Sequence, residues 1–202
     1  MSKVKVISAA VISASVLLAS QAAIANQAGD VFVRGGYAKT DTGSSNGSLA
    51  GDSLNVQNES GFTYGLGYLF TNNVGIELNG SEKFEHQLNT GALGDVGTTD
   101  RLPVNLMVNY YPLGGYASKV QPYVGAGLNY TRFSGVPSDV EIKDSYGAAA
   151  QVGIDLAVTD NVMLNGFANY ADVDSDYRVN GDTIGNVEME PVTIGGGVTL
   201  RF

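Results

Sequence analysis

Hydrophobic residues occupy every second position along most of this chain. Between Gly61 and Phe70 the even-numbered residues are all aromatic or aliphatic, whereas most odd-numbered residues are glycine or threonine. A period of two is the pattern of a β-strand whose two faces meet different surroundings. The same alternation recurs along the chain and predicts eight strands, at residues 30–40, 61–70, 74–84, 102–110, 120–131, 146–158, 162–171 and 191–202.

The segments between these strands alternate in length. Thr71–Asn73 and Thr159–Asn161 are short enough to be tight turns, and residues 112–119 form a modest connection. We therefore expect a chain that runs up and down, with short turns at one end and long loops at the other. The predicted loops are rich in Gly, Ser, Asn and Asp, which favours irregular structure, and they cover residues 41–60, 85–100, 134–144 and 172–186.

The second face of each strand decides between two all-β architectures. In a secreted β-sandwich the large residues would pack inward, and the second face would carry charged and polar side chains. Here that face consists mainly of Gly, Ala, Asn and Thr, and only 15% of all residues are charged. This composition favours an eight-stranded antiparallel up-and-down transmembrane β-barrel, in which large side chains contact lipid and small ones fill the lumen.

Aromatic residues near the strand ends agree with a barrel in a bilayer. Two belts of aromatic side chains usually mark the membrane interfaces of such barrels. The last strand is amphipathic and ends at Phe202, which looks like the signal read by the outer-membrane barrel assembly machinery. The belt candidates are Tyr64, Tyr130, Tyr146 and Tyr170 at the long-loop ends and Phe70, Tyr110 and Phe202 at the short-turn ends.

The first residues have the layout of a secretory signal peptide. Lys3 and Lys5 precede an apolar stretch at residues 6–18, which is followed by the small-residue site Ala23–Ala25. The apolar stretch is too short to cross a bilayer as a helix. We expect cleavage after Ala25, with Ala22 as the minor alternative. Residues 1–25 would then be the signal peptide, and residues 26–202 a single barrel domain.

Composition excludes several other functions. The chain has no cysteine, one histidine and a formal net charge of −9. It therefore lacks the ligands of common zinc sites and the basic surface that nucleic acids require. Asp172, Asp174 and Asp176 alternate, but the glycine and glutamate of a calcium-binding EF-hand loop are missing. His86 has no adjacent nucleophile, and we expect neither a metal, a cofactor nor an enzyme.

Several stretches closely resemble the outer membrane protein W family. They are Pro122–Thr131, Lys143–Ala149 and Gln151–Asp155, together with the terminal Arg201-Phe202. The resemblance implies an eight-stranded barrel of the Gram-negative outer membrane, in contact with lipid and lipopolysaccharide. It also implies a narrow channel that lets small hydrophobic compounds cross the lipopolysaccharide layer, with sideways release into the membrane.

Four charged residues are expected inside the barrel. By the alternation, Arg34, Glu77, Asp155 and Arg201 point inward, and each lies in the half of its strand nearest the short turns. Charged groups within a membrane are costly unless they are paired. We predict an ion-pair plug at that end, which either only rigidifies the barrel or also closes straight-through passage and forces ligands out through the wall.

The larger inward-facing residues are candidates for the channel lining. They could form an apolar pocket above the plug, or they could merely fill a small barrel. The wall would open most easily where strand pairing is weakest, and Pro103 and Pro122 cannot donate ladder hydrogen bonds. The lining candidates are Leu69, Met107, Tyr123, Met163 and Phe167.

Two functions therefore stand side by side. The first is a passive channel for small hydrophobic molecules. The second is a closed barrel with a structural or surface-interaction role, in which the long acidic loops act and the lumen is inert. An empty lumen would favour the first, and a packed lumen the second.

Overall fold

The computed structural model describes residues 26–42, 48–49, 52–56, 58–90, 94–134, 140–142, 144–179 and 182–202. The predicted signal peptide, residues 1–25, lies outside this part of the chain. Within the described ranges, no helix is long and apolar enough to cross a bilayer.

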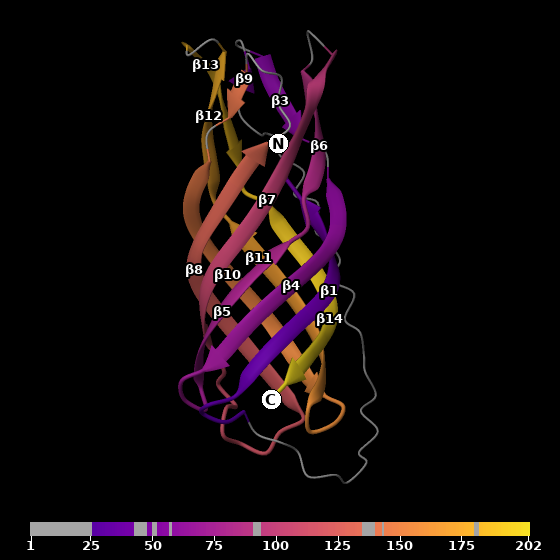
Figure 1. The fold of residues 1–202 in the computed structure, drawn as a ribbon, viewed down its shortest axis with the longest axis vertical. Coiled ribbons are helices and arrows are strands. Elements are labelled where there is room, and N and C mark those ends of the chain that lie inside the picture. Colours follow the sequence, from indigo (N-terminus) through magenta and orange to yellow (C-terminus); the bar gives the residue numbers. More distant parts are fainter. Residues whose placement is uncertain are drawn as a thin grey trace, which may run out of the picture.

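Eight strands pair antiparallel in a closed ring, which confirms the predicted fold (Figure 1). Neighbours in sequence are neighbours in the ring, β1 pairs with β14 to close it, and β5 pairs with β7. The ring consists of β1 (Val31–Asp41), β4 (Glu59–Leu69), β5 (Val74–Ser81), β7 (Gly94–Tyr110), β8 (Val120–Ser134), β10 (Ser145–Ala157), β11 (Val162–Ala171) and β14 (Val192–Arg201).

The segments predicted as long loops are largely extended structure, and the prediction of irregular loops was wrong there. Strands continue beyond the ring, at the upper end in Figure 1. Once the register of a hairpin is set, its two strands can continue to pair through backbone hydrogen bonds even where they have no apolar face. A sequence rich in Gly and Asn therefore does not end the strands. These strands are β2 (Ser48–Leu49), β3 (Asp52–Val56), β6 (Phe84–Thr90), β9 (Val140–Ile142), β12 (Val173–Val179) and β13 (Asp182–Met189).

Two tight turns at the other end share one design. Thr71 Oγ1 accepts hydrogen bonds from the backbone nitrogens of Asn73 and Val74, at 3.2 and 2.9 Å. Thr159 does the same for the backbone nitrogens two and three residues further on. A threonine hydroxyl that satisfies the turn backbone fixes a short hairpin connection. Both turns lie where the sequence predicted them.

The barrel is apolar outside and polar inside. Phe62 and Leu128 are 65% and 67% exposed on the outer face, whereas most fully buried side chains are polar or charged. The predicted belt residues Tyr146 and Phe202 are also exposed, at 80% and 72%. This arrangement is the reverse of a water-soluble core and is that of a membrane barrel.

Glycines line the seam between β1 and β14, where the strands approach closely. Gly36 pairs with Gly197 and Tyr37 with Gly196. A Cβ on Gly197 would collide with the backbone oxygen of Gly35, whereas a Cβ on Gly35 would meet nothing within 4 Å. Backbone cannot move aside as a flexible side chain can, so a side chain at Gly197 has no room.

We therefore expect Gly197→Ala to destabilise the barrel by about 1–3 kcal/mol, the usual cost of overpacking. Gly35→Ala is the matched control and should leave stability unchanged. Urea titration of the folded barrel in detergent micelles measures both. Equal midpoints for the two variants would contradict the close approach at the seam.

Candidate functional site

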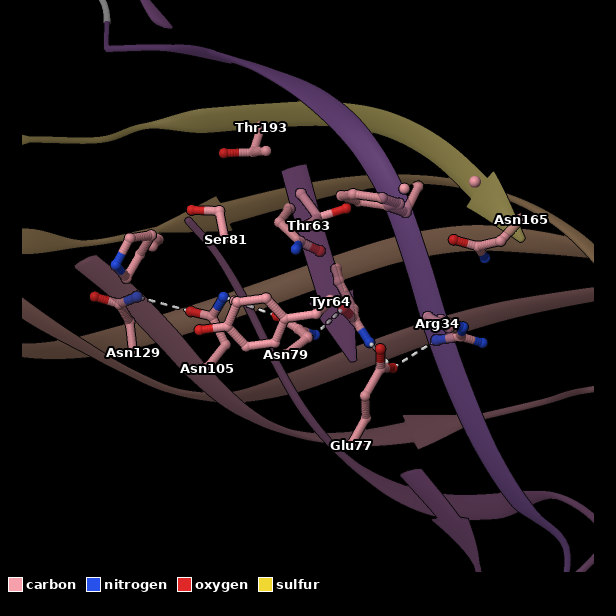
Figure 2. Close-up of a pocket in the computed structure, with 18 of the residues that line it drawn as sticks. Arg34, Thr63, Tyr64, Glu77, Asn79, Ser81, Asn105, Asn129, Asn165 and Thr193 are labelled. Carbon is pink, nitrogen blue, oxygen red and sulfur yellow. Dashed lines mark hydrogen bonds and ion pairs between the residues drawn. The ribbon is translucent and has the colours of Figure 1, made fainter. Parts of the chain in front are cut away.

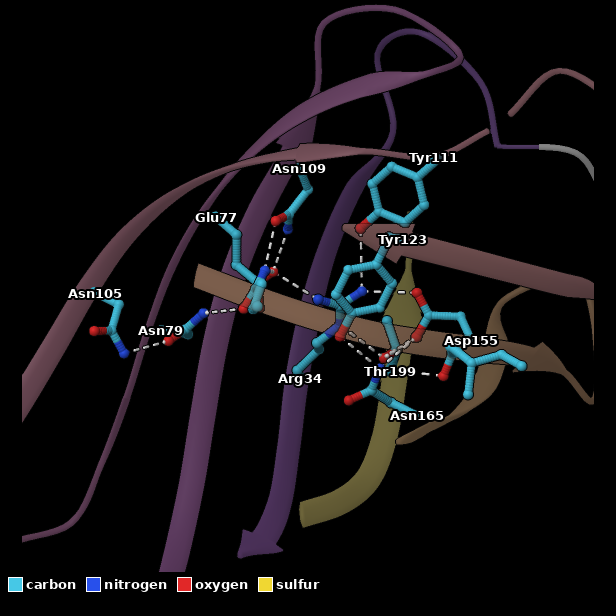
Figure 3. A network of polar contacts seen from close by, with 12 residues as sticks. Arg34, Glu77, Asn79, Asn105, Asn109, Tyr111, Tyr123, Asp155, Asn165 and Thr199 are labelled. Carbon is cyan, nitrogen blue, oxygen red and sulfur yellow. Dashed lines mark hydrogen bonds and ion pairs between the residues drawn. The ribbon is translucent and has the colours of Figure 1, made fainter. Parts of the chain in front are cut away.

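A buried ion-pair network crosses the lumen near the short-turn end (Figure 3). Arg34 extends from β1 and contacts carboxylates on two other strands. Its Nη1 donates to Glu77 Oε2 of β5 at 2.6 Å, and its Nη2 donates to Asp155 Oδ2 of β10 at 2.7 Å. All three residues are buried. Three of the four predicted charges thus lie together, and they link strands on different sides of the ring.

Neutral side chains complete the hydrogen bonding of both carboxylates. Glu77 Oε2 also accepts from Asn109 Nδ2 at 2.6 Å and from Gln151 Nε2 at 3.1 Å. Asp155 Oδ1 accepts from Asn165 Nδ2 at 2.8 Å. One guanidinium and two carboxylates carry a formal charge of −1, and the amide donors disperse that excess.

An aromatic layer covers this network on its short-turn side. The Arg34 guanidinium lies 4.5 Å from the Phe32 ring centre and 4.7 Å from that of Tyr123. Its Nη2 also donates to the Tyr111 hydroxyl at 3.2 Å. Tyr111 packs against Tyr123 with ring centres 5.3 Å apart, and Leu69 completes the buried cluster. Salt bridges and rings together fill the lumen at this end.

Arg201 is also buried at the short-turn end, but the contacts described for it go to partners other than Arg34, Glu77 and Asp155. Its Nη1 lies 3.2 Å from Asn26 Oδ1 and 3.7 Å from Asp30 Oδ2, and its Nη2 donates to the Asp160 carbonyl at 2.9 Å. Arg201 is the last residue of β14 and lies below the other charges. It ties the segment before β1 to the end of the barrel.

A ladder of side-chain hydrogen bonds extends from Glu77 toward the long-loop end (Figure 3). Each member donates to the next, with donor–acceptor distances of 2.7–3.1 Å. In order, the members are Thr131, Asn129, Asn105, Asn79, Gln151 and Glu77. The ladder gives the lumen wall a continuous polar stripe. The alternation of hydrophobic and polar positions in the sequence did not assign these residues to a site.

A cavity lies above the network and contacts this ladder (Figure 2). The cavity is open to solvent, and the space between its walls, open solvent included, is about 690 Å³. Arg34 and Glu77 line it on one side, whereas Arg101, Ala171 and Pro191 line it nearer the long-loop ends of their strands. The lumen is therefore closed by side chains at one end and hollow above them.

Only two of the five predicted lining residues border this cavity. Tyr123 and Phe167 line it, whereas Leu69, Met107 and Met163 do not. Leu69 ends β4 and Met163 is the second residue of β11, so both lie beside the short turns, and Met107 pairs with Glu77 at the level of the network. All three point inward as expected but are packed. Predicting them above the plug was wrong.

The barrel wall is interrupted beside Pro103. Pairs between β5 and β7 end at Gly80 with Val104, and pairs between β6 and β7 begin at Phe84 with Arg101. A Cβ on Gly80 would lie 2.7 Å from the Pro103 oxygen, so that carbonyl faces β5. The nitrogen of a strand residue faces the same side as its carbonyl, so the donor that proline lacks also faces the interruption.

The neighbouring strands bridge this interruption only partly. Glu82 donates its backbone N–H to the Phe62 oxygen at 2.9 Å, and its carboxylate accepts from the Phe62 nitrogen at 2.9 Å. A side chain thus replaces one backbone acceptor. Pro122, by contrast, pairs with Ile154 in a continuous register between β8 and β10, so we expect the wall to open less easily there than beside Pro103.

Comparison with known proteins identifies the family. The OmpW family model matches residues 27–202. This chain belongs to the OmpW family. It is 38% identical to outer membrane protein W of Escherichia coli over 81% of this chain and 84% of that protein. It is 36% identical to the Vibrio cholerae protein over 86% and 89% of the two chains.

A solved structure of the same architecture supports the assignment. The crystal structure of OprG from Pseudomonas aeruginosa matches with a TM-score of 0.79 and 27% identity, over 88% of this chain and 98% of that one. Like the OmpW proteins, this chain is an outer membrane β-barrel. The predicted family, fold and location are confirmed.

Proposed function

We propose that this OmpW-family barrel is a passive channel that takes up small hydrophobic molecules and releases them sideways into the membrane. The long-loop end would face the cell exterior, and entering molecules would reach the cavity from there. The observation that carries the proposal is a hollow in the lumen above a buried layer of salt bridges and aromatic rings. A solute that enters such a lumen needs an exit through the wall. The hollow also favours a channel over an inert barrel.

The position of the wall interruption suits an exit into lipid. Tyr110 is an exposed aromatic residue at the short-turn end of β7, and Pro103 lies on the same strand. With the usual rise and tilt of barrel strands, Pro103 stands about 18 Å above Tyr110 along the barrel axis. The apolar band of such barrels is about 25 Å tall, so this point faces hydrocarbon.

Pro103→Val tests the exit. Valine restores the missing backbone donor next to the interruption, so we expect a stiffer wall and slower uptake. Pro122→Val is the matched control and should transport at the wild-type rate, because its ladder is already continuous. The measurement is the rate at which N-phenylnaphthylamine fluorescence develops in intact Gram-negative cells that produce each variant at equal levels. Normal uptake by Pro103→Val with slow uptake by Pro122→Val would contradict this exit.

A further inference from the structure

Arg101 is a buried cation that the ion-pair network does not use. It lies near the long-loop end of the cavity, is 2% exposed and borders the empty space. No described residue accepts a hydrogen bond from its Nε or Nη1. Arg34, the other arginine on this cavity, is paired with two carboxylates. Of the two arginines on this cavity, one is therefore paired with carboxylates and the other has donors without a described acceptor.

A buried guanidinium is costly when, as among the described residues here, no anion lies against it. Removing a charge from water costs several kcal/mol unless an opposite charge or hydrogen bonds replace the solvent. Among the described residues that line the cavity, the one carboxylate is Glu77, and it already accepts from Arg34, Asn109 and Gln151. The Nε and Nη1 donors of Arg101 thus lie at a hollow without a described acceptor. Buried donors of this kind are the feature of a site that awaits a ligand.

The chemistry of the ligand follows from the rest of the lining. A guanidinium matches a carboxylate in planar two-point geometry. The network at the other end of the cavity carries a formal charge of −1, so it repels an anion and holds it at the Arg101 end. Phe167, Pro191 and Ala171 supply apolar surface for a short hydrocarbon chain.

We infer that Arg101 forms an anion subsite that binds the carboxylate of small aliphatic acids. The subsite specifies a substrate class for the proposed channel and rests on that function, but its binding is measurable without transport. An acid held here lies two residues along β7 from Pro103 and the wall interruption.

Titration calorimetry of the mature chain in a neutral, sugar-headed detergent tests the subsite. The probe is hexanoate, compared with hexanol and with inorganic phosphate. We expect hexanoate to bind in preference to both. Arg101→Gln should weaken hexanoate binding roughly tenfold or more, because a hydrogen bond to a charged group contributes about 1.5–3 kcal/mol. Arg132→Gln, which removes an exposed arginine of β8, should bind hexanoate like the wild type.

Each contrary result has a definite meaning. Absence of hexanoate binding, or binding that survives Arg101→Gln in a folded barrel, overturns the subsite. Equal binding of hexanol shows that the cavity takes apolar chains without reading the carboxylate, and equal binding of phosphate shows a general anion site. Both results overturn the aliphatic-acid assignment. In every case the uptake experiment with Pro103→Val tests the proposed exit of the channel separately.

Discussion

Arg34→Leu should lower the free energy of unfolding by about 3–5 kcal/mol, the usual cost of breaking a buried ion pair by removing one partner. The leucine would leave Glu77 and Asp155 facing each other across the lumen without a cation. Their amide donors remain but do not neutralise two negative charges. Urea titration in detergent micelles, followed by the gel shift of the unheated barrel, measures the loss.

Two further variants show whether the loss comes from unpaired charge. Lys39→Leu removes an exposed cation from the same strand and should leave the urea midpoint nearly unchanged. The combination of Arg34→Leu with Glu77→Gln and Asp155→Asn removes the stranded carboxylates and should recover much of the lost stability. If the combined variant is no more stable than Arg34→Leu alone, the network does not act through charge pairing.

The wild-type barrel should carry no steady ionic current in a planar bilayer, and removing the seal should create one. The variant replaces Arg34, Glu77, Asp155 and Tyr111 with alanine. It therefore leaves none of the three network charges unpaired, and it removes side chains that fill the closed end. Water can then fill a continuous path from the cavity to the short turns. Steady current steps are the expected result.

A variant of the outer face is the control for membrane insertion. Four exposed residues of the lipid-facing surface are replaced with alanine, which changes a similar number of side chains without touching the lumen. Like the wild type, this barrel should carry no steady ionic current. A large, steady current through the wild type would contradict the sealed end. The four residues are Phe62, Leu66, Val108 and Leu128.

Alternation predicted the network because it fixes both the face and the level of a side chain. Arg34, Glu77 and Asp155 all point inward and lie at similar distances from the short turns, which sequence position shows once the chain is known to run up and down. Arg201 shares the face but lies one step too close to the strand end, where the segment before β1 takes it up. Leu69 was predicted above the plug for the same reason. Its inward face was considered, but not its position at the short-turn end of its strand.

The wall interruption and the anion subsite depend on information that a single strand does not carry. The interruption is a shift in register between β5, β6 and β7, so it exists only in the pairing of strands. Arg101 falls between the predicted loop at residues 85–100 and the predicted strand at residues 102–110, so it was assigned to neither, whereas β7 begins at Gly94. β7 extends beyond the residues in which hydrophobic and polar positions alternate, because β6 pairs with it there.

The one-way ladder from Thr131 to Glu77 makes the lumen wall cooperative. Each amide uses its oxygen for the residue before it and its nitrogen for the residue after it, so no single member can rotate without costing both neighbours their bonds. Because the Glu77 carboxylate can only accept, it fixes the direction in which every member of the row donates. A solute that captures Asn129 at the mouth would thereby loosen the hold of Gln151 on Glu77, deep inside the barrel.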